Sequence, residues 1–337
     1  MKVLIIKTSS LGDLIHTLPA VTDAAKAIPD ISFDWVAEES FAEIPAWHPA
    51  VDKVIPIAIR RWRKKWNQAE VSAAVRALRK EQYDAVIDGQ GLIKSAIITR
   101  FAKGMRYGLD RHSCREPLAS FAYQHKVSIS RNQHAIDRVR QLFAKSLDYQ
   151  FDDSILDYGL NRSDFITTTN DRYLVFLHGT TWESKLYPEQ YWIELAKLAD
   201  KEGLKVYFPW GNETEKLRAE RMSAQCTNAT VPERMELTKM AALIAKAEGV
   251  IGVDTGLTHL SAALDVPGVT LYGSTSPELT GTRGHQHRCL QVEYDCAPCL
   301  QKKCHNGRIA AVKPPCYQSL PAAEVWSVLR SSGWVDS

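Results

Sequence analysis

Two successive series of short apolar runs, each alternating with helical patterns, constrain the fold of this chain more than any other feature of its sequence. In the first half the pattern predicts strands at 3–7, 33–39, 53–57 and 84–89, and helices at 14–27 and 71–80. Short apolar strands that are separated by helices are typical of parallel sheets with crossover helices. The first half is therefore predicted to form a doubly wound α/β domain.

The same alternation restarts after the polar stretch 161–172. It predicts strands at 173–179, 205–211, 249–254 and 269–273, and helices at 189–201, 213–225, 237–246 and 257–264. A length of 337 residues suits two domains of ordinary size, which we place at 1–162 and 170–337 with a cleft between them. Ligands of such sheets bind beyond the carboxyl ends of the strands, so the loops at these ends are the candidates for function.

No apolar stretch is long enough to cross a membrane, and Lys7 interrupts the apolar run at the N-terminus. We therefore expect a cytoplasmic protein whose seven cysteines are reduced. The sequence contains neither G-x-G-x-x-G nor G-x-x-x-x-G-K-[ST]. This absence argues against a dinucleotide-dependent oxidoreductase and against a P-loop kinase.

The strongest local signal is the stretch 254–259, DTGLTH, which follows a predicted strand and opens a helix. Thr255 can cap this helix, and Gly256 allows the backbone to approach a ligand closely. The N–H groups and the positive dipole end of a helix N-terminus favour an anion such as a diphosphate. The structural alternative is a helix cap beside a buried aspartate, Asp254.

A second loop, HGTTWESK at 178–185, ends the strand predicted at 173–179. Thr180 and Thr181 supply hydroxyl donors, and Lys185 supplies a positive charge for a phosphate leaving group. In isolation, Lys185 is equally well explained as a surface lysine before a helix. Two loops that suit phosphate within one half of the chain are more informative than either alone.

The loop after the first strand, 8–13, offers one carboxylate, Asp13. Asp13 either caps the following helix or acts as a general base that takes a proton from an incoming hydroxyl.

Four cysteines lie close together near the C-terminus: Cys296, Cys299, Cys304 and Cys316. This spacing resembles a four-thiolate site for a structural zinc or iron, and the alternative is a set of free thiols.

A basic run with two tryptophans lies in the first half of the chain. It consists of Arg60, Arg61, Arg63, Lys64 and Lys65, interleaved with Trp62 and Trp66. Residues 1–160 hold 23 Lys and Arg against 19 Asp and Glu. Such a run is either a solvated helix face or a docking site for a polyanion, namely a phosphate-bearing lipid or a nucleic acid.

Taken together, the stretches 7–20, 33–64, 83–96, 115–120, 176–185, 209–215 and 253–267 resemble the bacterial ADP-heptose:lipopolysaccharide heptosyltransferases, glycosyltransferase family 9. The basic run, followed by REPLAS at 115–120, resembles the branch that adds the first heptose more than the branch that adds the second. The resemblance implies a GT-B fold, which consists of two facing Rossmann-like domains. It also implies a C-terminal helix, here 320–334, that crosses back onto the first domain, after a Cys-rich loop at 289–316.

The resemblance also assigns residues to roles. Asp13 is the implied catalytic base, and Lys185 steadies the departing ADP. The donor ADP-heptose is assigned to Thr180, Thr181, Lys185, Glu215, Met235, Asp254, Thr255, Gly256 and His259. The acceptor Kdo-lipid A is assigned to Ser10, Arg60, Arg61, Arg63, Lys64, Gln90, Lys94 and Arg115.

These assignments predict an inverting transfer of heptose onto Kdo in the lipopolysaccharide inner core, with no cofactor required for catalysis. We expect the protein to lie at the cytoplasmic face of the inner membrane and not to bind nucleic acid. Another family member with a different acceptor, such as the second heptosyltransferase, is the nearest alternative. A sugar-nucleotide epimerase of the same architecture and a metal-containing nucleic-acid-binding protein are the other two.

Overall fold

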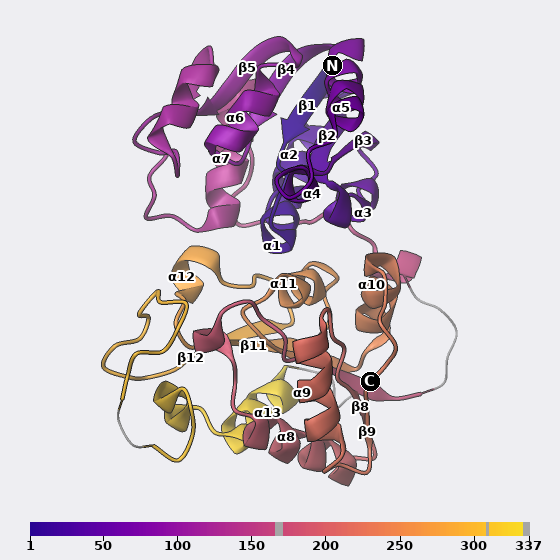
Figure 1. The fold of residues 1–337 in the computed structure, drawn as a ribbon, viewed down its shortest axis with the longest axis vertical. Coiled ribbons are helices and arrows are strands. Elements are labelled where there is room, and N and C mark those ends of the chain that lie inside the picture. Colours follow the sequence, from indigo (N-terminus) through magenta and orange to yellow (C-terminus); the bar gives the residue numbers. More distant parts are fainter. Residues whose placement is uncertain (166–170, 308–309, 333–337) are drawn as a thin grey trace. The chain divides into compact units, whose positions relative to one another are not determined.

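The computed structural model describes residues 1–165, 171–307 and 310–332, which divide into two compact units, Met1–Leu160 and Asn161–Ser337 (Figure 1).

The first unit contains a six-stranded sheet in which all neighbouring strands are parallel. Its strands are β1 Lys2–Ile6, β2 Ser32–Glu38, β3 Val51–Ile57, β4 Gln82–Asp88, β5 Lys103–Leu109 and β6 His125–Val127. Its helices are α1 Leu11–Ile15, α2 Leu18–Ala27, α3 Glu43–Ala46, α4 Ile59–Trp62, α5 Gln68–Lys80, α6 Ile93–Thr99 and α7 Ala135–Leu147, with 3-10 helices η1 Glu39–Phe41 and η2 Pro117–Ala122. The central strand β1 is almost fully buried because both faces of the sheet are covered.

The second unit contains a second six-stranded parallel sheet. Its strands are β7 Tyr173–Leu177, β8 Lys205–Tyr207, β9 Ala229–Thr230, β10 Gly249–Val253, β11 Gly268–Tyr272 and β12 His287–Gln291. Its helices are α8 Glu189–Lys201, α9 Glu213–Ser223, α10 Leu237–Lys246, α11 Gly256–Ala263, α12 Pro277–Thr280 and α13 Ala322–Ser331, with 3-10 helices η3 Arg162–Phe165, η4 Glu183–Lys185 and η5 Pro315–Ser319.

The two sheets have the same strand order. Numbered within its own unit, each sheet runs 3-2-1-4-5-6, as the orders β3-β2-β1-β4-β5-β6 and β9-β8-β7-β10-β11-β12 show. This is the Rossmann order, in which ligands bind where the order reverses, beside the carboxyl ends of the first and fourth strands. The predicted fold class is confirmed, and the order places the two switch points at β1/β4 and at β7/β10.

The C-terminal helix predicted at 320–334 is present as α13, and residues 333 and 334 lie outside the described part of the chain. Within the second unit α13 packs against α8, β11 and β12, and it contributes Val325 and Leu329 to the core. No helix in the described residues combines the length and the apolar character that a membrane span requires.

Some predicted elements have different bounds. The helix predicted at 14–27 is broken into α1 and α2 at His16 and Thr17, because Pro19 lacks an N–H group and its ring clashes with a preceding helical turn. The strand predicted at 205–211 ends at Tyr207. The strand β5 escaped prediction because its sequence, KGMRYGL, mixes charged and glycine residues and has no continuous apolar run.

Candidate active site

Asp13 lies at the first switch point, near the start of α1. Its Oδ2 accepts hydrogen bonds from the Ser10 backbone N–H (2.6 Å) and from the Ser10 hydroxyl (2.8 Å), so the structure confirms that Asp13 caps this helix. Its Oδ1 lies 3.9 Å from Nζ of Lys7, and the Asp13 side chain is 46% exposed. Because the cap uses only one carboxylate oxygen, capping leaves the other oxygen for proton transfer.

Lys7 is a buried residue directly after β1, and no role was predicted for it. Its Nζ donates to the carbonyl of Gly89 (2.7 Å). Burial lowers the pKa of Lys7 from its ordinary value, although the carboxylates of Asp13 and Asp88 oppose the shift. The sequence signal that could have identified Lys7 is a charged side chain at the end of an apolar strand.

Gln90 and Lys94 follow β4 and bind the loop that precedes α1, the helix that contains Asp13. The Gln90 Oε1 accepts from the backbone N–H (2.9 Å) and the hydroxyl (2.8 Å) of Thr8, and Nε2 donates to the Ser9 carbonyl (3.1 Å). Nζ of Lys94 donates to the Ser9 hydroxyl (2.8 Å), and burial lowers the pKa of Lys94. The structure thus brings these two predicted acceptor residues to the first switch point, where they order its loop.

Within the basic run, Arg61 is bound by two carboxylates. It donates to both oxygens of Glu39 (3.1 and 3.0 Å) and to Glu70 (2.8 Å). Hydrogen bonds to Glu39 and Glu70 raise the pKa of Arg61 above its ordinary value. The Arg60 guanidinium lies 4.8 Å from the ring centroid of Phe41. The cations therefore differ, and Arg61 has a structural role in joining α4 to η1 and α5.

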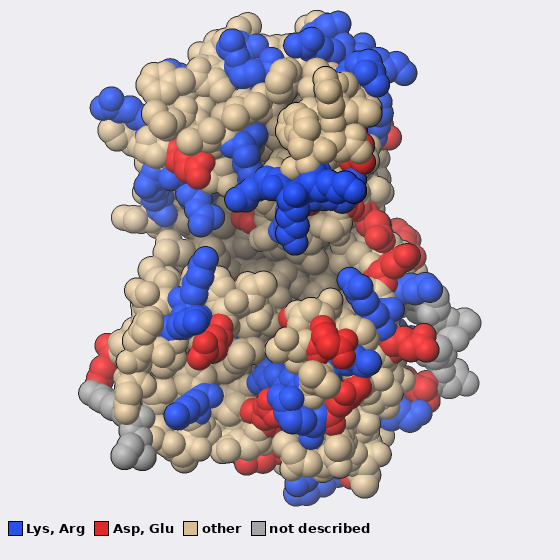
Figure 2. Space-filling view, in the orientation of Figure 1, with Lys and Arg blue, Asp and Glu red and all other residues tan. Residues whose placement is uncertain are grey.

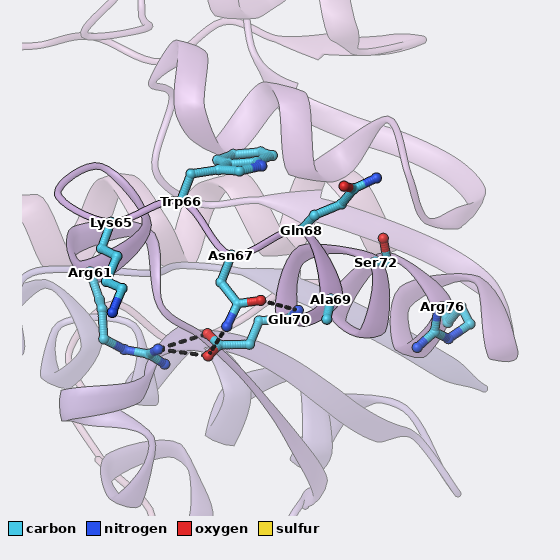
Figure 3. Close-up of a pocket in the computed structure, with 9 residues that line it drawn as sticks. All are labelled: Arg61, Lys65, Trp66, Asn67, Gln68, Ala69, Glu70, Ser72 and Arg76. Carbon is cyan, nitrogen blue, oxygen red and sulfur yellow. Dashed lines mark hydrogen bonds and ion pairs between the residues drawn. The ribbon is translucent and has the colours of Figure 1, made fainter.

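The two tryptophans of the run also differ. Trp62 packs partly against the core and donates its indole N–H to Glu70 (2.8 Å), whereas Trp66 is 70% exposed. Figure 3 shows Trp66 turned away from the Arg61–Glu70 pair, beside a cavity of about 900 Å³.

Arg63 and Lys64, the other two predicted acceptor residues of the basic run, are exposed. On the face that Figure 2 shows, blue side chains predominate over the first unit, while red and blue are interspersed over the second.

At the second switch point, Lys185 and Asp254 form a tight ion pair. Nζ of Lys185 lies 2.6 Å from Oδ2 of Asp254, and the two side chains are 14% and 8% exposed. The same oxygen accepts from the Thr275 hydroxyl (2.6 Å), and His259 Nε2 lies 3.4 Å from Oδ1. Burial opposes ionisation of Asp254, but His259 and Lys185 together lower its pKa below the ordinary value. Asp254 is thus a buried, ionised carboxylate that positions Lys185.

The helix α11 begins directly after Asp254. Thr255 occupies the N-cap position with extended backbone angles, and its carbonyl accepts from Thr258 and His259 N–H groups (3.1 and 3.3 Å). Thr255 is thus the N-cap residue, as predicted, but its hydroxyl makes no capping hydrogen bond, and the cap consists of the backbone alone. The N-terminus of α11, with Gly256 as its first residue, still has the dipole that favours an anion.

Glu215 lies against the loop that follows β7. A Cβ atom at Gly179 would lie 2.7 Å from the Glu215 carboxyl carbon, so only glycine leaves this carboxylate in place. The Glu215 Oε2 accepts from the Gly211 N–H (2.8 Å). Thr180 is half-buried and Thr181 is exposed. The predicted donor residues thus gather at the carboxyl ends of β7, β8 and β10.

Met235 is half-buried in the segment before α10. Trp210, which no motif singled out, donates its indole N–H to the Pro232 carbonyl (2.8 Å) and so joins the segment after β8 to the one that carries Met235. Residues in the Cys-rich loop and directly after it bind the backbone at Ser184 and Lys185. Lys302 accepts through its carbonyl from the Ser184 N–H (3.2 Å), and the Tyr317 hydroxyl donates to the Lys185 carbonyl (3.0 Å).

The four C-terminal cysteines, Cys296, Cys299, Cys304 and Cys316, line one cavity of about 290 Å³. All seven cysteines are free, and burial together with the three neighbouring thiols raises the pKa of Cys316 to about 11. Among the described residues, no group of three or more His, Cys, Asp or Glu side chains is arranged to hold a metal ion. The zinc or iron site that the cysteine spacing suggests therefore stays a prediction.

Comparison with known proteins gives one consistent result. Residues 71–310 match the profile of glycosyltransferase family 9 (heptosyltransferase). The chain is 53% identical over 310 residues to the lipopolysaccharide heptosyltransferase 1 of Pseudomonas aeruginosa, a match that covers 90% of this chain and 87% of that protein. Its identity to the lipopolysaccharide heptosyltransferase 2 of Salmonella typhimurium is 26% over 314 residues, which cover 87% and 88% of the two chains.

A solved structure with the same fold is that of the E. coli heptosyltransferase WaaC with ADP-2-deoxy-2-fluoro heptose. The TM-score is 0.84 at 43% identity, and the match covers 99% of this chain and all of the other.

Proposed function

The chain belongs to glycosyltransferase family 9, and we propose that it is a heptosyltransferase I, which transfers heptose from ADP-heptose to Kdo of Kdo-lipid A in the lipopolysaccharide inner core. The observation that carries this proposal is the similarity along nearly the whole chain to a heptosyltransferase 1, at 53% identity against 26% for a heptosyltransferase 2. The geometry of the two switch points supports it, because each supplies the chemistry that one half of such a transfer needs.

The donor end of the reaction belongs to the second unit. The diphosphate of ADP-heptose would bind at the N-terminus of α11 and beside the Lys185 ammonium, where both offset the negative charge that grows on departing ADP. Asp254 binds Lys185 and in turn accepts from the Thr275 hydroxyl, so the cation is oriented before the donor binds. Glu215 and Met235 would contact the nucleoside.

The acceptor end belongs to the first unit. Asp13 would take the proton from a Kdo hydroxyl while the oxygen of that hydroxyl attacks the anomeric carbon of the heptose. One C–O bond forms on the side opposite to the C–O bond that breaks, the electron pair leaves with ADP, and the configuration inverts. The Lys7 ammonium, 3.9 Å from Oδ1 of Asp13, would help to hold this carboxylate in position.

The phosphates and carboxylates of Kdo-lipid A would be bound by exposed cations, chiefly Arg63, Lys64 and Arg115. Since Arg61 is bound by Glu39 and Glu70, its contribution is the position of α4. Because the proposed acceptor is a lipid, we also propose that the enzyme works at a membrane surface, namely the cytoplasmic face of the inner membrane.

The proposal is tested by mixing the protein with ADP-heptose and Kdo-lipid A, and measuring ADP release together with the mass of the lipid product. We expect ADP release only when both substrates are present, and a product heavier by one heptose. A matched reaction uses an acceptor that already carries one heptose. ADP release with that acceptor alone would replace the proposal with heptosyltransferase II, and conversion of the donor without any acceptor would point to an epimerase.

A further inference from the structure

An apolar groove lies on the first unit between α6 and η2, far in sequence from the basic run. We call it the α6–η2 groove; it has a volume of about 320 Å³. Four of its side chains are unusually exposed for their type: Phe121 at 75%, Leu118 at 65%, Ile97 at 54% and Ile93 at 42%. An exposed apolar patch of this kind marks an interaction surface more often than a chance arrangement.

The groove is held in shape by the elements that carry it. Ile93 and Ile97 are four residues apart on α6, so they share one face of that helix. The carboxylate of Glu116 accepts from the Ile93 N–H (2.6 Å), and the Glu116 N–H donates to the Gly91 carbonyl (3.1 Å). These two bonds fix the start of η2 beside the start of α6. The apolar side chains are therefore presented by a rigid support.

Several cations lie beside the groove. Residues 93–126 hold seven Lys or Arg but two Asp or Glu, whereas the whole chain has a net charge of +3. Arg100 lines the groove, and Nζ of Lys126 lies 5.7 Å from the centroid of the Phe121 ring. Arg106 donates to the Ala122 carbonyl at the end of η2 (3.0 Å). Of the two acids, Glu116 is already bonded to the N–H of Ile93.

Apolar side chains with a rim of cations fit the interface of an anionic bilayer, where rings and branched chains enter below the headgroups and cations meet lipid phosphates. A second copy of the chain fits less well. A two-fold dimer through this groove would bring the same patch of both copies together, and with it the same excess of cations.

We propose that the α6–η2 groove inserts into the interfacial layer of an anionic phospholipid membrane and so brings the enzyme to its lipid acceptor. The inference rests on the proposed function, because only a lipid-borne acceptor gives this surface a purpose in catalysis. Leu118 and Phe121 carry most of the insertion, since they are the two most exposed of the four.

The test is flotation of the full chain with vesicles of phosphatidylcholine alone, or of phosphatidylcholine mixed with phosphatidylglycerol. The wild type should float with the mixed vesicles and stay largely in solution with the neutral ones. Leu118→Gln/Phe121→Gln should lower partition into the mixed vesicles by at least about tenfold, because two apolar side chains no longer leave water. The matched control is Ile155→Gln/Leu217→Gln, which changes two side chains of 54% and 49% exposure elsewhere and should float like the wild type.

Equal flotation of both variants, or no flotation of the wild type, would overturn the inference. So would a wild-type dimer in sedimentation velocity that Leu118→Gln/Phe121→Gln converts to monomer, because the groove would then bind a second copy. Thermal unfolding midpoints show whether the variants are folded.

The activity assay separates this inference from the proposed function. With a water-soluble, deacylated Kdo acceptor, Leu118→Gln/Phe121→Gln should turn over like the wild type, while turnover of Kdo-lipid A in vesicles should fall. If the wild type fails with both acceptors, the proposed function fails, and flotation still tests the groove. If the variant falls equally with both acceptors, the groove has no specific role at the membrane.

Discussion

Each of the two switch points holds a lysine and an aspartate, but the two pairs are built differently. In the first unit, Nζ of Lys7 lies 3.9 Å from Asp13, whose side chain is 46% exposed. In the second, Nζ of Lys185 lies 2.6 Å from Asp254, whose side chain is 8% exposed. In the first pair the carboxylate is the exposed member and the lysine is buried. In the second pair the carboxylate is the more buried member.

The difference indicates which member of each pair does chemistry. A half-exposed carboxylate at 3.9 Å from its cation can receive a proton, which suits a general base. A buried carboxylate that also accepts from Thr275 cannot do so at neutral pH, because its pKa is lowered. In the proposed transfer Asp254 would therefore act as a positioning residue, and Lys185 would be the group that meets the diphosphate.

The largest effect is expected for Asp13→Ala. Loss of the base should lower kcat by about a thousandfold, within the usual range for general acid–base catalysis, while calorimetric affinity for ADP stays unchanged. Because Asp13 also caps α1, a stability loss of about 1 kcal/mol should accompany it. The variant Ser10→Ala is the control, since it removes the hydroxyl partner but keeps the carboxylate. If Ser10→Ala lowered kcat as much as Asp13→Ala, the comparison would break, because capping would explain both.

A smaller effect is expected for Lys185→Met, which keeps the length of the side chain and removes its charge. Without this cation the departing ADP is less stabilised, and kcat should fall by about a hundredfold. Affinity for ADP should fall in parallel, unlike in Asp13→Ala. Lys302→Met is the matched control, since Nζ of Lys302 lies 6.0 Å from the Trp182 ring but forms no ion pair with Asp254. Unchanged ADP affinity in Lys185→Met would remove Lys185 from the donor site.

Much of this fold could be predicted because both sheets consist largely of buried parallel strands. Strands such as β7 and β10 are buried throughout and read as continuous apolar runs. Strands near the sheet edges, such as β5 and β6, are partly exposed and carry Lys, Arg and His, so their sequences lack that signal. The break before Pro19 follows from a local rule on proline in helices, which the prediction of one continuous helix did not apply.

The residues of the candidate site could be named from sequence, but their partners could not. Asp254 and Lys185 were both singled out, yet 69 residues separate them, and no local pattern states that they form a pair. Thr275 binds Asp254, and Trp210 binds the carbonyl of Pro232. Each of these bonds joins segments that follow different strands, and such segments become neighbours only through the strand order of the sheet. Family resemblance assigned Arg61 and Gln90 to the acceptor. The geometry showed that both side chains form hydrogen bonds within the protein itself.

The buried pair can also be tested through the pH dependence of stability. The pKa of Asp254 is lowered from 3.8 in the folded state, so its contribution to stability is complete above about that pH and is lost as pH falls further. Asp254→Asn cannot make this contribution at any pH. The stability gap between wild type and Asp254→Asn, measured by urea unfolding, should therefore be widest near neutral pH and narrow below about pH 4, by about 1.4 kcal/mol for each unit of pKa shift. A gap that stays constant would mean that Asp254 is not ionised in the native pair.

The smallest effect is expected for Thr275→Val, which removes the hydroxyl that donates to Asp254 and keeps the shape of the side chain. Asp254 would keep its ion pair with Lys185 but lose one of its restraints, so affinity for ADP should fall several-fold, corresponding to about 1 kcal/mol. Thr270→Val is the matched control, because Thr270 is a buried threonine whose hydroxyl pairs with Thr282 and His287 and not with Asp254. Both variants should lose similar stability, and only Thr275→Val should weaken ADP binding. If Thr270→Val weakened it equally, general loosening of the second unit would account for the loss, and the enclosed carboxylate would not be what orients Lys185.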